Sequence, residues 1–301
     1  MITDRYPLVS IITVNYKQAE VTLALLDSLQ QITYPNIEVI VVDNGSNDGS
    51  VEKISQQAPW SKLIPSSSNL GFAGGNNLGL TEAKGELMLF INNDVEVAPD
   101  FLEPLVEAIQ QPNVGAVSPK IKFYYNPETI QYAGSTPLNY LTMRNRAIGF
   151  AEQDNGQHDK PRQTAFAHGA AMLVSRAVVN KVGPMYDGYF LYYEELDWCE
   201  HIRKVGYTIM YEPRSVIYHK ESISTGKQSP LKTYYLNRNR LLFLKRNTNG
   251  LTRILGYVYF LGVAVPKRFL TTLINRQPKH RKALIQSILW HFNPKRYDYV
   301  D

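Results

Sequence analysis

The sequence predicts an α/β fold with a mostly parallel sheet flanked by helices, followed by a basic helical region at the C-terminal end. Two observations lead to this prediction. Short runs of β-branched apolar residues alternate with helical patterns over roughly the first ninety residues, which is typical of strand–helix–strand units and a parallel sheet. The balance of charge also changes sign near residue 227, and such a shift marks a boundary between regions.

The strands and helices are predicted from the spacing of apolar residues. Leu8–Val14 is a short apolar run of the buried-strand type, and the helix expected next, Ala19–Gln31, has Val21, Leu25 and Leu29 on one face. The later elements are expected, in order, as a strand Ile37–Val42, a helix Ser50–Gln57, a strand Lys62–Pro65, a helix Gly75–Ala83 and a strand Leu87–Ile91. Ligands of such open sheets bind beyond the carboxyl ends of the strands, so the residues that follow each strand are candidates for function.

The composition is that of a globular protein. Of the 301 residues, 44% are hydrophobic and 20% are charged, which excludes a disordered or collagen-like chain. The single cysteine, Cys199, excludes an internal disulfide. The first residues lack a basic-then-apolar leader, so we expect no cleaved signal peptide. The longest apolar run, Ile254–Val265, has twelve residues where a bilayer core needs about 20, so we expect no membrane span and a cytoplasmic protein.

Basic residues are concentrated in the C-terminal region. From Lys227 onward the chain has 15 Lys and Arg against 2 Asp and Glu, whereas residues 1–226 have 17 against 25. We therefore expect two domains, 1–226 and 227–301. Interleaved aromatic residues favour an anionic membrane over nucleic acid as the partner, with the protein peripheral on the inner face of the cell membrane. Residues 251–301 are expected to form amphipathic helices whose apolar side chains face lipid or, alternatively, pack on the body of the protein: Tyr257, Phe260, Phe269, Leu273, Trp290 and Phe292.

Asp43 ends a strand without an apolar reason to be there. Within Asp43-Asn44-Gly45-Ser46 it favours a turn, or it is a carboxylate that accepts a hydrogen bond from a nucleotide base or ribose. The nearby loop Asn69–Leu80 is dense in glycine but contains neither GxGxxG nor GK[ST]. That absence counts against an NAD enzyme and against a P-loop NTPase.

A metal-binding carboxylate is expected after the strand that ends at Ile91. The residues that follow are Asn92-Asn93-Asp94, and a carboxylate there binds a divalent cation that bridges two phosphates. The alternative is a helix N-cap, but the next helix begins too late for Asp94 to cap it. His219 and His168 also lie at sheet positions, where a lone histidine is more often structural than a metal ligand.

Three carboxylates, Glu194, Glu195 and Asp197, lie beside aromatic residues that include Trp198. A helix N-terminus explains one or two of them, because acidic residues there are favourable to the helix dipole. Three neighbouring acids beside apolar rings are also expected to raise the pKa of at least one carboxyl group, as a general base requires.

Seven motifs occur in this order: VSIITVNYKQ, VIVVDNGSNDGS, NLGFAGGNN, LMLFINNDVEVAPDFL, HGAAMLVSR, YYEELDWCEHIRKVGY and VIYHKESIS. Together they resemble family 2 glycosyltransferases with the GT-A fold, and most closely the rhamnosyltransferase-like bacterial branch that builds surface polysaccharides. The resemblance covers roughly Pro7 to Asn247. It implies a transferase that moves a sugar from a nucleotide-diphosphate donor with inversion, assisted by Mg2+ or Mn2+.

The resemblance also implies roles for individual residues. Asp43 matches the aspartate that recognises the base. Asp94 matches the metal ligand of the DXD motif, which here reads Asn92-Asn93-Asp94, and His219 matches a histidine of the metal shell. Glu195 matches the general base, although aspartate is commoner there. The remaining expected residues are Glu194 and Asp197 as catalytic support; Thr13, Asn15, Tyr16, Gly71, Asn76, Asn92 and Asn93 for the nucleotide donor; His168, Gly169 and Trp198 on the acceptor side; and Arg238 and Arg240 for the diphosphate.

The mechanism that the resemblance implies is a single displacement. Glu195 takes the proton of the acceptor hydroxyl as that hydroxyl attacks the anomeric carbon.

We expect dTDP-rhamnose or a UDP-hexose as donor, a saccharide acceptor that suits a lipid link, and no nucleic acid. A nucleotidyltransferase and a non-catalytic carbohydrate-binding protein on the same fold remain alternatives. Residues 123–162 lack clear periodicity and are a candidate acceptor-side loop or lid.

Overall fold

The structure is a computed structural model of the chain and describes residues 6–220 and 229–299. The chain divides into two compact units. The sheet unit comprises Met1–Pro137, Arg146–Phe190 and Glu194–Ser224, and the helical unit comprises Leu138–Asn145, Leu191–Tyr193 and Thr225–Asp301. The domains 1–226 and 227–301 that the charge balance suggests remain a prediction.

The sheet unit contains a ten-stranded sheet in the order β3-β2-β1-β4-β9-β6-β10-β5, with β7 beside β6 and β8 beside β10. The strands are β1 Val9–Asn15, β2 Ile37–Asp43, β3 Lys62–Pro65, β4 Leu87–Ile91, β5 Val95–Val97, β6 Val114–Phe123, β7 Asn126–Tyr132, β8 Arg162–Thr164, β9 Ala171–Ser175 and β10 Thr208–His219. Strand β1 pairs in parallel with both β2 and β4, β2 pairs in parallel with β3, and β6 pairs in parallel with β10. The predicted fold class, an α/β fold with a mostly parallel sheet, is confirmed.

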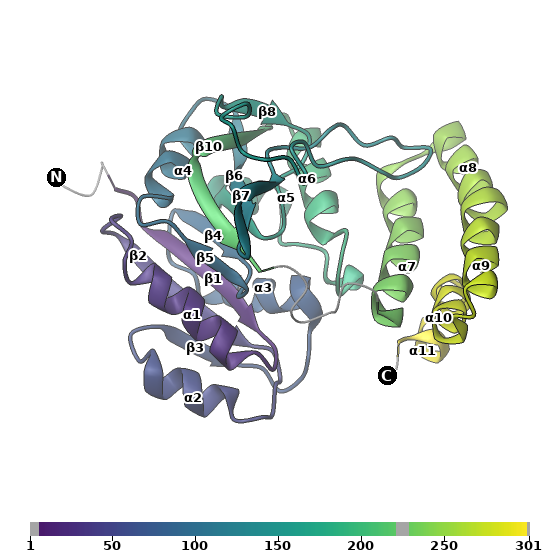
Figure 1. The fold of residues 1–301 in the computed structure, drawn as a ribbon, viewed down its shortest axis with the longest axis horizontal. Coiled ribbons are helices and arrows are strands. Elements are labelled where there is room, and N and C mark those ends of the chain that lie inside the picture. The colour runs from purple at the N-terminus through teal and green to yellow at the C-terminus, as the bar shows by residue number, and fades with distance from the viewer. Residues whose placement is uncertain (1–5, 221–228, 300–301) are drawn as a thin grey trace. The chain divides into compact units, whose positions relative to one another are not determined.

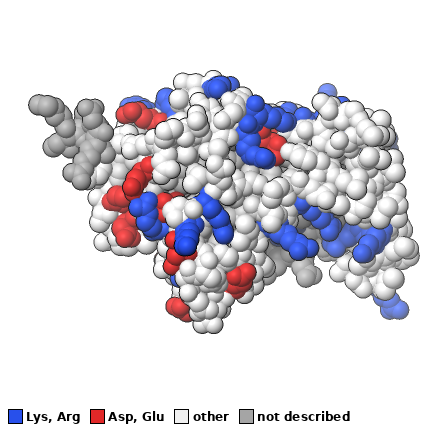
Figure 2. Space-filling view, turned by 90° about the horizontal axis from the view of Figure 1, so that it is seen from above, with Lys and Arg blue, Asp and Glu red and all other residues white. Residues whose placement is uncertain are grey.

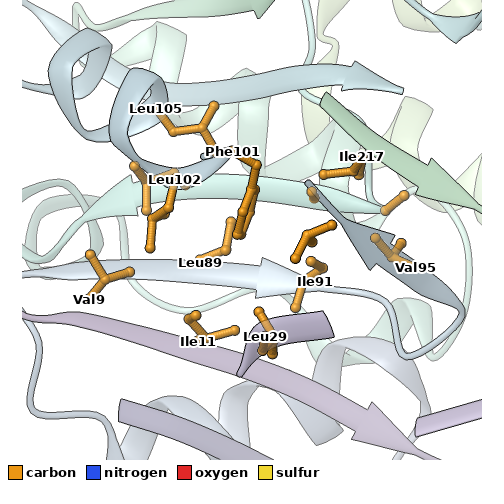
Figure 3. Close-up of a cluster of buried hydrophobic side chains, with 14 of the residues drawn as sticks. Val9, Ile11, Leu29, Leu89, Ile91, Val95, Phe101, Leu102, Leu105 and Ile217 are labelled. Carbon is orange, nitrogen blue, oxygen red and sulfur yellow. The ribbon is translucent and has the colours of Figure 1, made fainter. Parts of the chain in front are cut away.

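Helices cover both faces of this sheet (Figure 1). They are α1 Ala19–Leu29, α2 Ser50–Gln57, α3 Gly71–Glu82, α4 Leu102–Ile109, α5 Arg176–Val182 and α6 Glu194–Lys204. Figure 3 shows Phe101, Leu102 and Leu105 directed from the α4 side toward Leu89 and Ile91 of β4. Because successive side chains of a strand point to opposite faces, the ring of Phe90 lies on the other side of β4, 5.3 Å from the ring of Trp198 of α6.

Helix α3 begins four residues earlier than the sequence predicts, at Gly71 rather than Gly75. Glycine lowers helix propensity, so the glycine-rich stretch reads as a loop. The glycines instead allow the helix backbone to lie close to the sheet. A Cβ atom at Gly79 would be 2.5 Å from Cγ2 of Ile12, and one at Gly75 would be 2.9 Å from Cγ1 of Val14. Tertiary packing therefore outweighs the local preference.

Residues 123–162, predicted as a candidate acceptor-side loop or lid, include regular secondary structure. Strand β7 lies within this segment and pairs with β6. Asp154, further along it, forms ion pairs with Lys122 at 2.9 Å and with Lys120 at 3.1 Å. The weak periodicity arises because β7 is exposed over its first three residues and buried over its last three. A role as a lid remains a prediction.

The helical unit consists of α7 Pro230–Asn247, α8 Gly250–Tyr259, the π-helical turn η2 Phe260–Ala264, α9 Val265–Ile274, α10 Pro278–Leu289 and α11 Pro294–Tyr297. Elements α8, η2 and α9 form one helix, Gly250–Ile274, which is drawn as a single long rod in Figure 1. By length and composition this helix is apolar enough to cross a membrane, and 11% of its most apolar window is buried. The expectation of no span considered only the uninterrupted apolar run.

Candidate active site

The carboxyl ends of β1, β2 and β4 lie side by side at one edge of the sheet. In the parallel pairing of β1 with β2, Asn15 is opposite Asp43. In the parallel pairing of β1 with β4, Ile12 is opposite Phe90. Asn15 lies three residues after Ile12, and Asn93 lies three residues after Phe90, so both come at the same level of the sheet. Parallel pairing therefore brings the three polar segments predicted from the sequence to one place.

A chain of buried hydrogen bonds joins these strand ends. Nδ2 of Asn15 donates to Oδ2 of Asp43 at 2.7 Å, and Ser46 donates to Asp43 through its hydroxyl at 2.7 Å and its backbone N–H at 3.0 Å. On the other side, the hydroxyl of Thr22 donates to Oδ1 of Asn15 at 2.8 Å and accepts from Nδ2 of Asn93 at 3.0 Å. All five side chains are buried. The chain of bonds therefore fixes Asp43 and Asn93 relative to α1.

Asp94 lies against His219, as the pairing of β5 with β10 requires. These strands are antiparallel, with Val95 opposite His219. Nε2 of His219 is 3.1 Å from Oδ1 of Asp94, and Nδ1 is 2.8 Å from Oε1 of Gln131. With the Gln131 amide oriented as in this structure, Nδ1 carries the hydrogen. Nε2, the other ring nitrogen, then faces the Asp94 carboxylate, an arrangement that suits a cation between them.

His168 lies next to this pair because β9 runs antiparallel to β4. The backbone N–H of Asn92 donates to the carbonyl of Ala170 at 3.0 Å, and the ring centroids of His168 and His219 are 6.1 Å apart. The N–H of Ala170 donates to Nδ1 of His168 at 3.0 Å. Burial, reinforced by the nearby His219, lowers the pKa of His168 to about 3. His168 is therefore a neutral ring at neutral pH.

The donor set fits a divalent cation that takes only part of its coordination from protein. Within residues 6–220 and 229–299, no cluster of three or more His, Cys, Asp or Glu could hold a metal ion. Asp94 and His219 could supply two donor atoms, and Oδ1 of Asn92 is buried without a hydrogen-bond partner among the described residues. Mg2+ is usually held by one or two carboxylates together with substrate phosphates and water. Such a site needs no third acidic or histidine ligand.

The three acidic residues in the first turn of α6 have different surroundings. Glu194 and Asp197 are buried, and Asp197 accepts a hydrogen bond from the hydroxyl of Tyr189 at 2.9 Å. Glu195 is partly exposed, and a Cβ atom built on Gly169 would be 3.6 Å from its Cγ. Gly169 directly precedes Ala170, whose carbonyl accepts a hydrogen bond from the N–H of Asn92 just after β4. Glu195 therefore lies beside the segment that borders the end of β4.

The backbone before α6 is strained. Phe190, Tyr192 and Tyr193 have φ values of 62°, 69° and 78°. Residues other than glycine rarely adopt this left-handed backbone conformation. Strain of this kind is concentrated at functional sites. Its position immediately before Glu194 supports the choice of this segment as part of the site.

The other residues expected at the donor site have varied surroundings. Thr13 is buried, and its hydroxyl has no hydrogen-bond partner among the described residues. Tyr16 is exposed, whereas Asn76 is buried and donates to the carbonyl of Phe72 within α3 at 2.9 Å. Gly71 has a φ of 72°, and a Cβ atom there would be 2.3 Å from the carbonyl oxygen of Phe190. Only glycine fits at this position without a shift of the backbone.

Trp198, expected on the acceptor side, has the contacts of a core residue. It is 1% exposed, packs against Phe90, and donates its indole N–H to the carbonyl of Gly183 at 2.9 Å. Its neighbour Cys199 is also buried, which raises the pKa of the thiol to about 12. Neither side chain offers a reactive group to solvent.

Arg238 and Arg240, expected to bind diphosphate, lie on α7 and are buried in the helical unit. The guanidinium of Arg238 is 4.6 Å from the ring centroid of Trp290. That of Arg240 is 5.1 Å from the ring of Phe260 and donates to the carbonyl of Thr142. Burial lowers the pKa of both arginines from its ordinary value. These contacts give both side chains a packing role, and their binding of diphosphate remains a prediction.

Sequence reasoning did not find two residues of this site, Thr22 and Gln131. Thr22 lies three, four and seven residues before Leu25, Leu26 and Leu29 on the buried stripe of α1. A hydroxyl on an apolar stripe is a signal for a buried hydrogen bond, because an unpaired one is costly there. Gln131 lies in the segment that was expected to be irregular, so no pattern indicated it.

Comparison with known proteins gives consistent results. The profile described as Glycosyl transferase family 2 matches residues 10–183. The chain is 30% identical to the low-salt glycan biosynthesis hexosyltransferase Agl10 of Haloferax volcanii, over 77% of this chain and 74% of Agl10. It is 24% identical to the N-acetylglucosaminyl-diphospho-decaprenol L-rhamnosyltransferase of Mycobacterium tuberculosis, over 82% and 86% of the two chains. It is also 30% identical to an uncharacterized protein of Sinorhizobium fredii, over 80% of this chain but only 27% of that protein.

Among solved structures, the fold is similar to that of the mannosyltransferase PcManGT from Pyrobaculum calidifontis in complex with GDP-Man and Mn2+. The TM-score is 0.61 at 17% sequence identity, and the match covers 96% of this chain and 88% of that one. At this identity the likeness concerns the fold.

The hydrogen-bond chain through Thr22 is open to a direct test. Replacing Thr22 with Val should lower the free energy of unfolding by about 1–3 kcal/mol, because Asn15 and Asn93 each lose a buried partner. Thr22→Ser should retain most of the stability, since it keeps the hydroxyl. Urea unfolding measures each change. The matched control is Thr33→Val, whose hydroxyl bonds are exposed and which should cost less. Equal losses of unfolding free energy at both positions would show that the buried hydrogen bonds of Thr22 stabilise the fold no more than the exposed ones of Thr33.

Proposed function

Because the chain belongs to glycosyl transferase family 2, we propose that it transfers a sugar from a nucleotide-diphosphate donor to a saccharide acceptor, with inversion at the anomeric carbon. The match over residues 10–183 carries the proposal. That match includes β1, β2 and β4, whose ends hold the buried polar chain. The GT-A-type fold, similar to that of a mannosyltransferase, agrees with it.

The donor would bind beyond the ends of β1 and β2. Asp43 accepts three hydrogen bonds from Asn15 and Ser46, and an ionised carboxylate offers about four acceptor positions. We infer that the remaining position recognises an N–H of the nucleotide base. The backbone of Gly71, where a side chain does not fit, suits the close approach of a ligand.

Asp94 and His219, with Asn92 beside them, would hold the divalent cation. When bound, Mg2+ or Mn2+ stabilises the negative charge that gathers on the leaving diphosphate. Support for this assignment comes from the facing acceptors of Asp94 and His219 and from the unpartnered amide oxygen of Asn92 within the described residues. PcManGT was solved with Mn2+ and GDP-Man. The neutral His168 would add no positive charge beside the cation.

Glu195 would act as the general base. An acceptor hydroxyl is a poor nucleophile, so proton removal must accompany its attack. The hydroxyl oxygen forms a bond to the anomeric carbon, the bond from that carbon to the diphosphate oxygen breaks, and the proton goes to Glu195. One displacement from the opposite face inverts the centre. Glu195 is partly exposed, whereas Asp197 is held by Tyr189, which makes Asp197 a positioning residue.

The donor sugar and the acceptor are proposed from the names of relatives. The M. tuberculosis relative is named as an L-rhamnosyltransferase acting on a diphospho-decaprenol-linked sugar, and Agl10 is named as a hexosyltransferase. We therefore propose dTDP-rhamnose or a UDP-hexose as donor, and a lipid-linked saccharide as acceptor, in the synthesis of a surface polysaccharide.

The proposed reaction is tested by supplying nucleotide sugars with and without a lipid-linked saccharide and measuring the nucleotide product. Release of nucleoside diphosphate that requires the acceptor is expected. Release of pyrophosphate from a nucleoside triphosphate would instead indicate a nucleotidyltransferase. Saccharide binding without any release would indicate a carbohydrate-binding protein.

Replacing Asp43 with Ala should weaken nucleotide binding by about 1–3 kcal/mol, the scale of one lost hydrogen bond to a charged group. Isothermal titration calorimetry with nucleoside diphosphates measures the change. Asp48→Ala is the matched control, because Asp48 lies in the same loop, is exposed, and accepts a hydrogen bond from the backbone N–H of Ser50. Unchanged affinity of the Asp43 variant for every nucleotide would remove this residue from the site.

Replacing Asp94 with Ala should abolish both transfer and the part of nucleotide binding that depends on Mn2+, because the cation loses its carboxylate ligand. Titrations with Mn2+ and with EDTA measure the metal-dependent part. Glu96→Ala is the control, since Glu96 lies two residues away and is paired with Lys220 at 2.7 Å. Near-normal turnover of the Asp94 variant in EDTA would show that the assignment is wrong.

Replacing Glu195 with Gln should lower turnover by about 10²–10⁴-fold, the usual contribution of a general base, with donor affinity nearly unchanged. Gln keeps the shape of Glu but does not accept the proton. Glu195→Asp should keep partial activity at a shorter reach. Steady-state kinetics on both variants and on Asp197→Asn measure the effects. If Glu195→Gln is fully active and Asp197→Asn is inactive, the base is Asp197.

A further inference from the structure

One side of the helix Gly250–Ile274 is apolar and open to solvent. The exposed fractions of six side chains on it lie between 48% and 69%. Their spacing of three or four residues within α8 and within α9 places them on one stripe of each helix. We call this set the apolar face: Leu251, Ile254, Leu255, Val258, Leu270 and Leu273.

The opposite side of the same helix is already covered within the helical unit. Gly256 and Phe260 are buried. A Cβ atom at Gly256 would be 2.6 Å from Cδ1 of Leu244 on α7, and the guanidinium of Arg240 lies over the ring of Phe260 at 5.1 Å. Helix α9 likewise packs against α10. The helix is therefore held on its inner side, and the apolar face is what this packing leaves uncovered.

Basic side chains lie toward the C-terminal end of the apolar face. Lys267, Arg268, Arg276, Lys279 and Lys282 are exposed on α9, on α10 and between them. From Lys227 onward the sequence has only 2 acidic residues against 15 basic ones. The right-hand part of Figure 2, where the helical unit lies, shows broad white surface with blue patches along one border. An apolar stripe combined with Lys and Arg is the pattern of helices that bind at the interface of anionic lipid.

We propose that the apolar face of Gly250–Ile274 inserts into the interfacial layer of an anionic phospholipid bilayer, with the helix lying in the membrane plane. A second chain of this protein fits the same apolar residues less well, because two copies would bring strongly basic surfaces together. The proposal concerns the helical unit alone and does not depend on the proposed transferase activity.

The packing favours an in-plane helix over a spanning one, although the helix is long enough to span. Helix α10 packs beside α9 and carries Lys279, Arg281 and Lys282. If α9 crossed the hydrocarbon core, these charges and those of Lys267 and Arg268 would be drawn toward it, at high cost. Lying in the plane places the same charges at the level of the headgroups.

Vesicle flotation of the full chain tests the proposal. Binding is expected to vesicles of phosphatidylcholine and phosphatidylglycerol in equal amounts, to be weak on phosphatidylcholine alone, and to fall at least about tenfold in high salt, where headgroup attraction is screened. Alkaline carbonate should release the protein. Equal binding to both vesicles, or no binding to either, would overturn the proposal, and resistance to carbonate would overturn the in-plane orientation.

Two variants assign the binding to the apolar face. The double variant Ile254→Asp, Val258→Asp should reduce binding to the anionic vesicles at least about tenfold, because charges replace inserted apolar groups. Tyr125→Asp is the control, since Tyr125 is 78% exposed in the sheet unit, and it should bind like the parent chain. Circular dichroism checks that each variant is folded, and the corresponding Ser double variant replaces the Asp one if it is not. Unchanged flotation of a folded double variant would overturn the assignment. A parent chain that does not float but forms dimers in light scattering, which the double variant loses, would show that the face binds a second copy.

Discussion

Burying polar groups at the ends of strands imposes a strict condition, because each buried donor or acceptor without a partner costs about 1–3 kcal/mol. Where β1, β2 and β4 end, side chains meet this condition by bonding to one another. Thr22 is the link, since it reaches Asn93 on one side and Asn15 on the other. The orientation of Asp43 is thereby determined before any ligand arrives, and a group that is already ordered loses less entropy on binding.

The parts of the fold that the sequence predicted are those whose signal is local. A strand of a parallel sheet is buried on both faces and reads as a continuous apolar run, which is why the bounds of β4, whose five residues are all buried, agree with the structure. The start of α3 was missed because its glycines serve a contact with Ile12 of β1 that propensity does not contain. Gln131 was missed for the same reason, since it belongs to the site only through β7 and its contact with His219.

In the candidate site, too, the sequence predicted what depends on local signals and missed what depends on contacts between distant segments. The sequence was enough to mark the residues at the ends of the parallel strands as candidates, but the hydrogen bond between Asn15 and Asp43 comes from the structure. The pairing of Asp94 with His219 depends on β5 and β10, which are far apart in sequence, and only the family resemblance associated the two residues. Charge counts were equally limited, because composition does not say which basic groups are exposed. Arg238 is buried against Trp290, whereas Lys267 and Arg268 face solvent.

The left-handed backbone before α6 has a consequence for attempts to engineer the protein. Each such conformation costs about 1–3 kcal/mol for a residue with a side chain, and glycine adopts it freely. Replacing Tyr193 by glycine would relieve this strain, but it would also remove the ring that packs against Phe243 and the hydroxyl that donates to the carbonyl of Met143. Selection for thermal resistance would therefore favour glycine at this position only if the strain relieved exceeds the packing and the hydrogen bond lost. At this turn, relief of backbone strain favours glycine, whereas side-chain packing favours an aromatic residue at the same position.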